Sequence, residues 1–216
     1  MMKNLEIKNI KNILFFDVDG TLIDSFEGIK YSLKIAVNQF GLTLPSDEVL
    51  RQFVGPPIEK SIETYYSLDA VASKEISQIF QAIYNNKGYK YARLYDNIED
   101  LLKTCENYGK YIVTNKNPLY ASKMLKYFGI SKFFIDVLCT NREKQINKSH
   151  LINEKLKYHS HVISAIMIGD TIEDYKAVLN SVCKFIGVTY GFGFRPGEYY
   201  EFVTCDNINE LKKKLM

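Results

Sequence analysis

The sequence has no tryptophan, few cysteines and no long apolar run. Its four cysteines lie far apart and form no CxxC pair, which argues against a zinc site and against a disulfide framework; they are Cys105, Cys139, Cys183 and Cys205. No apolar segment approaches the ~20 residues that cross a bilayer, and the N-terminal residues lack the continuous apolar stretch of a signal peptide. We therefore expect a cytoplasmic protein with reduced thiols and no membrane partner.

A strong charge of either sign is also missing. Lys and Arg total 28 and Asp and Glu total 25, which gives a formal net charge of +3, and the basic residues are scattered. Neither this weak bias nor the 16 tyrosines, which follow no basic stripe, favours binding to a nucleic acid polymer. What remains is a globular composition, 46% hydrophobic and 25% charged, in a chain of 216 residues that has room for a core domain and an insertion.

Alternating helix and strand patterns dominate most of the chain. Residues 13–17 (ILFFD) form an apolar run that ends in an acid, which is typical of a strand buried on both faces, and Gly20 marks a sharp turn just after it. From residue 93 onward, helical segments alternate with apolar strand segments at 111–114, 137–139, 163–168 and 184–188. This alternation predicts an α/β fold with a doubly wound parallel sheet, built from residues 1–24 and 93–216.

Residues 25–92 show little strand character. Apolar side chains in this stretch recur at steps of three and four residues, which is typical of amphipathic helices. We expect this insertion to be a small, all-helical cap domain. It is interrupted at Gly55, Pro56 and Pro57, which form either a simple helix break or a rigid loop.

Polar side chains follow three of the predicted strands. Because the carboxyl ends of parallel strands share one edge of a sheet, where ligands bind, residues distant in the sequence converge there. The residues concerned are Asp17 with Asp19, Thr114 with Asn115, and Asp170 with Asp174. A carboxylate can attack phosphorus, a second acid can protonate the leaving group, and carboxylates from two strand ends suit Mg²⁺. Since a hydroxyl and an amide can bind phosphoryl oxygens, the pattern points to phosphoryl transfer.

The sequence resembles the haloacid dehalogenase (HAD) superfamily over nearly its whole length. ILFFDVDGTL at 13–22 resembles the first motif of that superfamily, IVTN at 112–115 the second, the lysine of NKSHLI at 147–152 the third, and IMIGDTIED at 166–174 the fourth. The insertion after the first motif resembles the helical cap of the branch that contains phosphoglycolate phosphatases and nucleotidases, and FVGPPIEKS at 53–61 resembles its cap loop. The resemblance implies a Rossmann-like core.

The resemblance also implies a role for each acid. Asp17 would be the nucleophile and Asp19 the general acid and base. Mg²⁺ would be bound by the Asp17 carboxylate, the Asp19 backbone carbonyl and the Asp170 carboxylate. Asp174 would order metal-bound waters or the lysine of the third motif, and such outer partners matter for metal affinity.

The phosphoryl group would be held by four residues, namely Gly20, Thr114, Asn115 and Lys148. Proline often follows the lysine of the third motif in this superfamily, whereas Ser149 follows Lys148 here. Lys144 is a rival for this position. We prefer Lys148 because it directly precedes a helical pattern.

We expect hydrolysis of a small phosphorylated metabolite through a phospho-aspartyl intermediate, with the loop at 55–57 touching the leaving group. The resemblance suggests phosphoglycolate and nucleoside monophosphates as substrates. The alternatives are an inorganic pyrophosphatase, a phosphomutase resembling β-phosphoglucomutase and, outside the enzymes, a receiver-like phospho-acceptor switch. A receiver keeps its acceptor acid on the middle strand, where this chain has Thr114 and Asn115, and dehalogenase chemistry has no need of Asp19.

Overall fold

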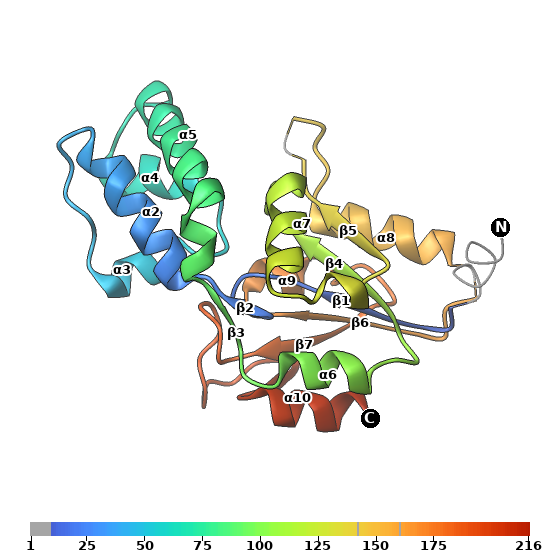
Figure 1. The fold of residues 1–216 in the computed structure, drawn as a ribbon. Coiled ribbons are helices and arrows are strands. Elements are labelled where there is room, and N and C mark those ends of the chain that lie inside the picture. Colours follow the sequence, from blue (N-terminus) through green and yellow to red (C-terminus); the bar gives the residue numbers. More distant parts are fainter. Residues whose placement is uncertain (1–9, 142, 160) are drawn as a thin grey trace. The chain divides into compact units, whose positions relative to one another are not determined.

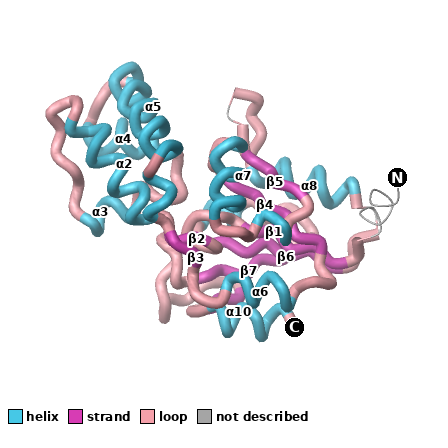
Figure 2. The backbone as a smooth tube through the Cα atoms, in the orientation of Figure 1, coloured by secondary structure: helices cyan, strands magenta, loops and turns pink. Residues whose placement is uncertain are grey.

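The structure is a computed structural model that describes residues 10–141, 143–159 and 161–216. Within these residues the chain forms two compact units. The core unit consists of the described residues up to Leu22 together with Tyr95–Met216, and the inserted unit is Ile23–Leu94. Figure 1 labels the elements of both units, and Figure 2 separates helices from strands by colour. Most of the N-terminal stretch in which we expect no signal peptide lies outside the described residues.

A six-stranded sheet forms the centre of the core unit, with strand order β5-β4-β1-β6-β7-β8 and every neighbouring pair parallel. The strands are β1 (Asn12–Phe16), β4 (Gly109–Thr114), β5 (Asp136–Cys139), β6 (Ser164–Gly169), β7 (Lys184–Val188) and β8 (Val203–Cys205). The predicted α/β fold with a parallel sheet is confirmed, and β8 is an additional strand that the sequence pattern does not indicate.

Helices cover both faces of this sheet. They are α6 (Ile98–Thr104), α7 (Pro118–Tyr127), α8 (Lys148–Tyr158), α9 (Ile172–Lys176) and α10 (Ile208–Leu215), with a short 3-10 turn η2 (Ser131–Phe133). Figure 1 shows α6 and α10 together on one side of the sheet and α8 on the other. No helix in the described part of the chain is long and apolar enough to cross a membrane.

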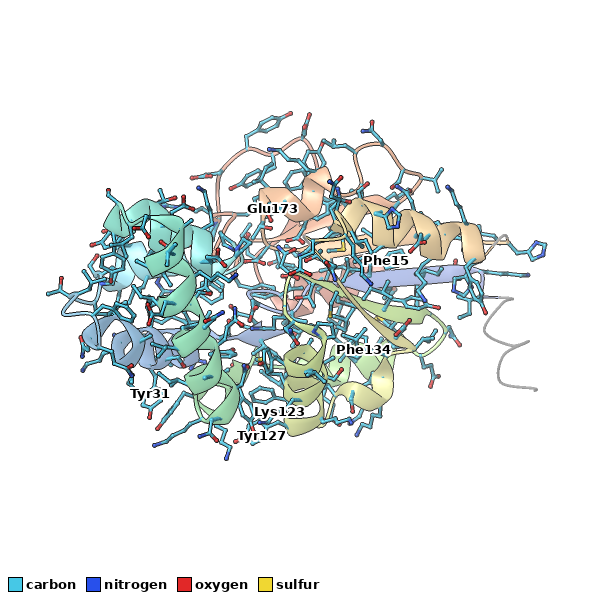
Figure 3. All side chains as sticks on the ribbon, turned by 90° about the horizontal axis from the view of Figure 1, so that it is seen from above. Phe15, Tyr31, Lys123, Tyr127, Phe134 and Glu173 are labelled. Carbon is cyan, nitrogen blue, oxygen red and sulfur yellow. The ribbon has the colours of Figure 1, made fainter. Side chains whose placement is uncertain are left out.

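The central strand β1 is buried on both faces, which explains its apolar sequence. Successive side chains of a strand point to opposite faces. Phe15 packs against Tyr111 with ring centroids 5.7 Å apart, whereas Phe16 meets Phe134 edge to face at 6.1 Å. Figure 3 labels Phe15 and Phe134. The strand is therefore held firmly from both sides, and the residues that follow it start from a fixed position.

The body of the inserted unit is helical, as expected. It contains α2 (Phe26–Asn38), α3 (Asp47–Arg51), α4 (Ile58–Tyr66), α5 (Ala70–Asn86) and the 3-10 turn η1 (Gly88–Tyr91). Its first and last residues pair as an antiparallel ribbon of β2 (Ile23–Asp24) and β3 (Arg93–Leu94). These four residues flank the predicted insertion of residues 25–92, whose regular elements are all helical. Strands of two residues are too short to show an alternating pattern, so the sequence alone does not indicate them.

Glycine lets helix α2 pack closely within the inserted unit. A Cβ added at Gly28 would lie 2.6 Å from Gly88 O, which is a backbone atom and cannot rotate aside. The Gly28 carbonyl accepts a hydrogen bond from the buried Ser32 hydroxyl at 2.8 Å, which fixes this part of the helix further. The helix surface at Gly28 therefore has no room for a methyl group.

We predict that Gly28→Ala destabilises the protein, although alanine is the better helix former by ~1 kcal/mol. The added methyl group would overlap the Gly88 carbonyl, and overpacking of this kind costs ~1–3 kcal/mol. Urea unfolding followed by circular dichroism measures the change, with Lys34→Ala on the exposed side of α2 as the control. If Gly28→Ala proved as stable as Lys34→Ala, the close packing described here would be wrong.

Candidate active site

Three neighbouring strands of the core sheet end beside one another. The chain leaves β1 at Asp17, ends β4 at Thr114 and passes from β6 into Asp170. Asp17 N donates a hydrogen bond to Ile168 O at 3.0 Å, which continues the pairing of β1 and β6 to the edge of the sheet. The carboxyl ends at which we predict the site therefore lie side by side.

A buried lysine connects two of the acids. The Nζ atom of Lys148 lies 2.8 Å from Asp17 Oδ1 and 2.6 Å from Asp174 Oδ1. All three side chains are buried. A lysine is almost never fully buried unless it is paired, so this ammonium depends on its two carboxylates.

The start of α8 explains which lysine reaches the acids. Asn147 is the N-cap of this helix, and its Oδ1 accepts a hydrogen bond from His150 N at 2.9 Å, so the helix begins at Lys148. Lys144 lies in the preceding loop and is exposed. Of the two candidates for the lysine of the third motif, the structure brings Lys148 to the acids.

Burial changes the proton affinities of these groups. Burial raises the pKa of Asp17 to about 7, against the opposing charge of Lys148. Burial also raises the pKa of Asp170, and Asp174 and Asp17 raise it further. For Lys148, burial lowers the pKa, but Asp17 and Asp174 together raise it above its ordinary value. With the three carboxylates ionised, three negative charges would face one positive charge, and a divalent cation would neutralise the excess of two.

The site also has the donor atoms that such a cation prefers. Carboxylate oxygens of Asp17, Asp170 and Asp174 lie within 4.8 Å of one another. Both oxygens of Asp174 already accept hydrogen bonds, Oδ1 from Lys148 at 2.6 Å and Oδ2 from Thr171 Oγ1 at 2.6 Å. Asp174 thus connects the lysine to the start of α9, and the choice of Asp17 and Asp170 as cation ligands rests on the sequence resemblance. Oxygen donors of this kind fit Mg²⁺, which the sequence resemblance implies.

Gly20 allows the loop after β1 to approach Asp170. The φ angle of Gly20 is 79°, in the left-handed region that favours glycine, and a Cβ at this position would overlap the Asp170 carboxylate. Thr21 Oγ1 donates a hydrogen bond to Asp170 Oδ1 at 3.3 Å. The turn thus brings the first motif into contact with Asp170 of the fourth motif. A contact between Gly20 and a phosphoryl group stays a prediction.

Asp19 forms an ion pair that the sequence pattern does not predict. Its Oδ2 lies 2.9 Å from Lys116 Nζ, and both side chains are largely buried. Its Oδ1 is buried and has no hydrogen-bond partner among the residues that the structure describes. One oxygen of Asp19 is therefore held by an ion pair, while the other makes no hydrogen bond to the described residues. Lys116 directly follows Thr114 and Asn115, and this position at a strand end is the signal that could have identified it.

The two polar residues at the end of β4 have different surroundings. Thr114 is buried, and its hydroxyl accepts a hydrogen bond from Lys116 N at 3.2 Å. The Asn115 side chain donates to Glu173 Oε2 at 3.3 Å and accepts from Thr140 Oγ1 at 3.1 Å; Glu173 belongs to α9 and is labelled in Figure 3. Asn115 is thus bonded to α9 and to the residue that follows β5, which makes Thr114 the more direct candidate for a phosphoryl contact.

The predicted cap loop lies within the inserted unit, between α3 and α4. The φ angle of Gly55 is 97°, which favours glycine, and Pro57 is the N-cap residue of α4. Pro56 lies between them. The loop therefore separates two helices, and its contact with a leaving group stays a prediction.

Comparison with known proteins agrees with the motifs. The chain matches the family model described as haloacid dehalogenase-like hydrolase over residues 14–188. It is 29% identical to a phosphoglycolate phosphatase of Vibrio parahaemolyticus, over 83% of this chain and 84% of the relative. It is 30% identical to a 5'-nucleotidase of Pseudomonas aeruginosa, over 84% of each protein.

Solved structures of other proteins have a similar fold over nearly the whole chain. A predicted phosphatase from Clostridium acetobutylicum has a TM-score of 0.82 and 29% identity, and the match covers 95% of this chain and 98% of the other. A haloacid dehalogenase-like hydrolase from Streptococcus pneumoniae has a TM-score of 0.82 and 30% identity, covering 95% of this chain and 99% of the other. The similarity therefore extends over both units of the chain.

We predict that Lys148→Met destabilises the metal-free protein by ~3–5 kcal/mol at about pH 8, because it leaves buried carboxylates without their ammonium. A carboxyl group whose pKa is raised on folding disfavours the folded state increasingly as the pH rises through that pKa. Since burial raises the pKa of Asp17 to about 7, the group can take up a proton at about pH 5, and the loss should be smaller there.

Urea unfolding in EDTA at the two pH values measures both effects. The exposed Lys144→Met is the matched control and should change stability little, since it removes the same charge from the surface. An equal loss at both pH values would contradict the assignment of the effect to buried charge.

Proposed function

The chain belongs to the haloacid dehalogenase-like hydrolase family and is a phosphatase, and we propose that it hydrolyses a small phosphomonoester with Asp17 as the nucleophile and Mg²⁺ as the cofactor. The observation that carries this proposal is the buried Lys148 between Asp17 and Asp174. Asp170 adds a third buried carboxylate nearby. Three buried carboxylates thus face a single ammonium group. A purely structural salt bridge would not need the additional carboxylates, because an unpaired buried charge costs free energy. A site that binds a cation together with an anionic substrate does need them.

In the first step, an oxygen of Asp17 attacks phosphorus, and the bond between phosphorus and the ester oxygen breaks. Asp19 gives its proton to the departing oxygen, which leaves as an alcohol. The product is an acyl phosphate on Asp17. Lys148, at 2.8 Å from Asp17 Oδ1, favours the ionised carboxylate that this attack requires.

In the second step, Asp19 removes a proton from water, and the resulting hydroxide attacks phosphorus. The bond between phosphorus and the Asp17 oxygen breaks, which releases inorganic phosphate and restores the carboxylate. We assign both proton transfers to the Oδ1 atom of Asp19, which has no hydrogen-bond partner among the described residues. Lys116 pairs with the other oxygen and so orients the Asp19 carboxyl group.

The Asp17 carboxylate, the Asp19 carbonyl and the Asp170 carboxylate are the groups that we assign to Mg²⁺. When bound, the ion supplies positive charge that offsets the repulsion between the nucleophile and an anionic phosphate. Asp174 has a different task in this proposal. It holds Lys148, and its other oxygen accepts hydrogen bonds within the turn that starts α9.

The remaining contacts divide between the two units. We assign Gly20, Thr114, Asn115 and Lys148 to the phosphoryl oxygens, which all substrates share. The loop at 55–57 of the inserted unit is assigned to the leaving group, where substrates differ. The names of the two curated relatives support phosphoglycolate and a nucleoside monophosphate as the substrates to test first. A cytoplasmic location remains part of the proposal.

A panel of phosphorylated compounds assayed with Mg²⁺ tests the proposal. The panel should contain 2-phosphoglycolate, nucleoside monophosphates, inorganic pyrophosphate and a sugar phosphate, so that the pyrophosphatase and phosphomutase alternatives are measured in the same experiment. We predict that Asp17→Asn lowers kcat/KM by at least ~10³-fold for every substrate, because an amide is a poor nucleophile and a poor metal ligand. EDTA should suppress the wild-type activity.

The exposed Glu106→Gln removes the same charge and serves as the control, because Glu106 precedes β4 and so lies at the opposite edge of the sheet from the site. Its kcat/KM values should equal those of the wild type. Substantial turnover by a folded Asp17→Asn protein would refute the mechanism, and a clear preference for pyrophosphate would replace the proposed substrate class.

A further inference from the structure

One segment that the proposed mechanism leaves without a role is bonded to Asp170. Residues 190–194, called here the YGFGF segment, follow β7 in the core unit. Phe192 N donates a hydrogen bond to Asp170 Oδ2 at 2.8 Å, and Phe194 N donates to Asp170 O at 2.9 Å. The segment therefore holds both the side chain and the backbone of a single aspartate.

Tyr190 connects the same segment to the loop after β1. Its hydroxyl donates to Thr21 O at 2.9 Å, and the Thr21 hydroxyl donates to Asp170 Oδ1 at 3.3 Å. Tyr190 thus fixes the residue that holds one oxygen of Asp170, while Phe192 N holds the other. The orientation of this carboxylate is set at both of its oxygens.

Glycine makes the close approach possible. A Cβ at Gly191 would lie 2.5 Å from Asp170 Oδ2 and would also overlap the Gly20 carbonyl, and a Cβ at Gly193 would overlap the Asp170 carbonyl. Neither residue has a left-handed φ angle. Glycine is therefore required here because the backbone lies so close to Asp170, and not because of its own conformation. A loop that merely joins two strands has no need of such contact with one carboxylate.

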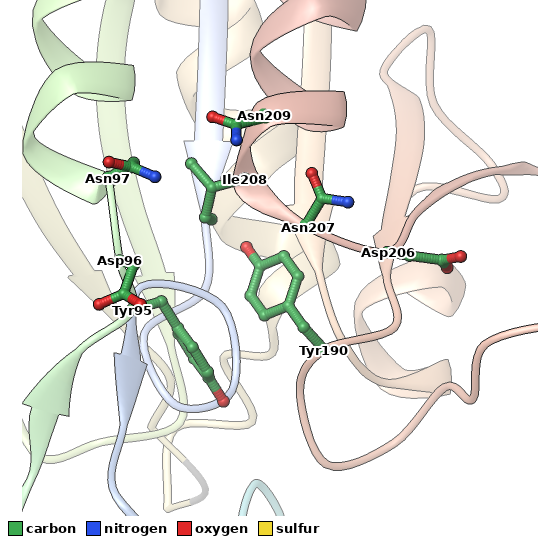
Figure 4. Close-up of a pocket in the computed structure, with 8 residues that line it drawn as sticks. All are labelled: Tyr95, Asp96, Asn97, Tyr190, Asp206, Asn207, Ile208 and Asn209. Atoms are coloured by element: carbon green, nitrogen blue, oxygen red, sulfur yellow. The ribbon is translucent and has the colours of Figure 1, made fainter.

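Aromatic packing anchors the segment. Phe194 is buried, with its ring centroid 5.1 Å from that of Phe202 and 5.0 Å from that of Tyr200. The ring of Tyr190 lies 4.8 Å from that of Tyr95, beside a pocket of about 190 Å³ (Figure 4). None of the acids of the candidate site lines this pocket, which is also smaller than the ~300–1,000 Å³ of most ligand sites. Tyr190 therefore lies between this small pocket and the loop after β1.

We propose that the YGFGF segment is a positioning element for metal binding, which holds the Asp170 carboxylate and the loop at Thr21 in the geometry that receives Mg²⁺. The inference rests on the Mg²⁺ site of the proposed function. Groups that hydrogen-bond to a metal-binding side chain change metal affinity by ~10- to 100-fold when they are altered. A segment with a purely structural role would change stability to unfolding and leave the affinity for Mg²⁺ as it is.

Calorimetric titration of the metal-free protein with MgCl₂, in the absence of substrate, tests this inference. Tyr190→Phe removes one hydroxyl and should raise the Kd for Mg²⁺ roughly 2- to 10-fold, the effect of one hydrogen bond. Gly191→Ala forces the Asp170 carboxylate to move and should raise the Kd at least ~10-fold. Tyr199→Phe is the matched control at an exposed tyrosine and should bind as the wild type does. Asp170→Asn should abolish the binding, which identifies the site that the titration reports.

All proteins are compared at a temperature at which circular dichroism shows them folded. If Gly191→Ala does not fold, the Kd of Tyr190→Phe for Mg²⁺ is the sole test of the inference. Wild-type affinity for Mg²⁺ in folded Tyr190→Phe overturns the inference and leaves the proposed function untouched. A wild-type protein that binds Mg²⁺ through Asp170 but hydrolyses no phosphomonoester contradicts the proposed function alone. A wild-type protein that binds no Mg²⁺ contradicts both.

Discussion

The ammonium of Lys148, held between Asp17 and Asp174, is the interaction on which the site depends. It joins three elements that are distant in the sequence, since the first acid follows β1, the lysine begins α8 and the second acid lies in α9. All three groups are buried, so the loss of any one leaves an uncompensated charge in the interior. With Asp170 nearby, the acids still outnumber the ammonium. This imbalance is the physical reason for expecting a divalent cation and, with it, an anionic substrate.

The rest of the core unit fixes where these charges lie. The parallel sheet places the ends of β1, β4 and β6 at one edge, and the burial of β1 on both faces keeps that edge in a fixed position. Two loops then approach Asp170 closely, one at Gly20 and one at Gly191, because neither position carries a Cβ. The Asp170 carboxylate is held by hydrogen bonds from both loops. A mobile carboxylate would have to be ordered by each incoming cation, whereas this one is ordered in advance.

Much of this arrangement follows from the sequence, for reasons that also explain what does not. The long apolar runs of β1 and β6 and the acids after them predict converging strand ends, because parallel strands share one edge. The short strands β2, β3 and β8 carry no periodic pattern and depend on partners far away in the chain. The pairing of Lys116 with Asp19 depends on the path of a long, flexible side chain. Nothing in the spacing of the glycines of the YGFGF segment shows which carboxylate they approach.

A covalent phosphate on Asp17 is the central claim, and rapid acid quenching followed by peptide mass spectrometry tests it most directly. The protein is mixed with Mg²⁺ and an aryl phosphate, quenched during turnover and digested. The account predicts one added phosphoryl group on the peptide that contains Asp17. The label should accumulate further in Asp19→Asn, because breakdown of the acyl phosphate needs a base to activate water. A phosphoryl group on another residue, or turnover by Asp19→Asn without any enzyme-bound phosphate, would contradict the account.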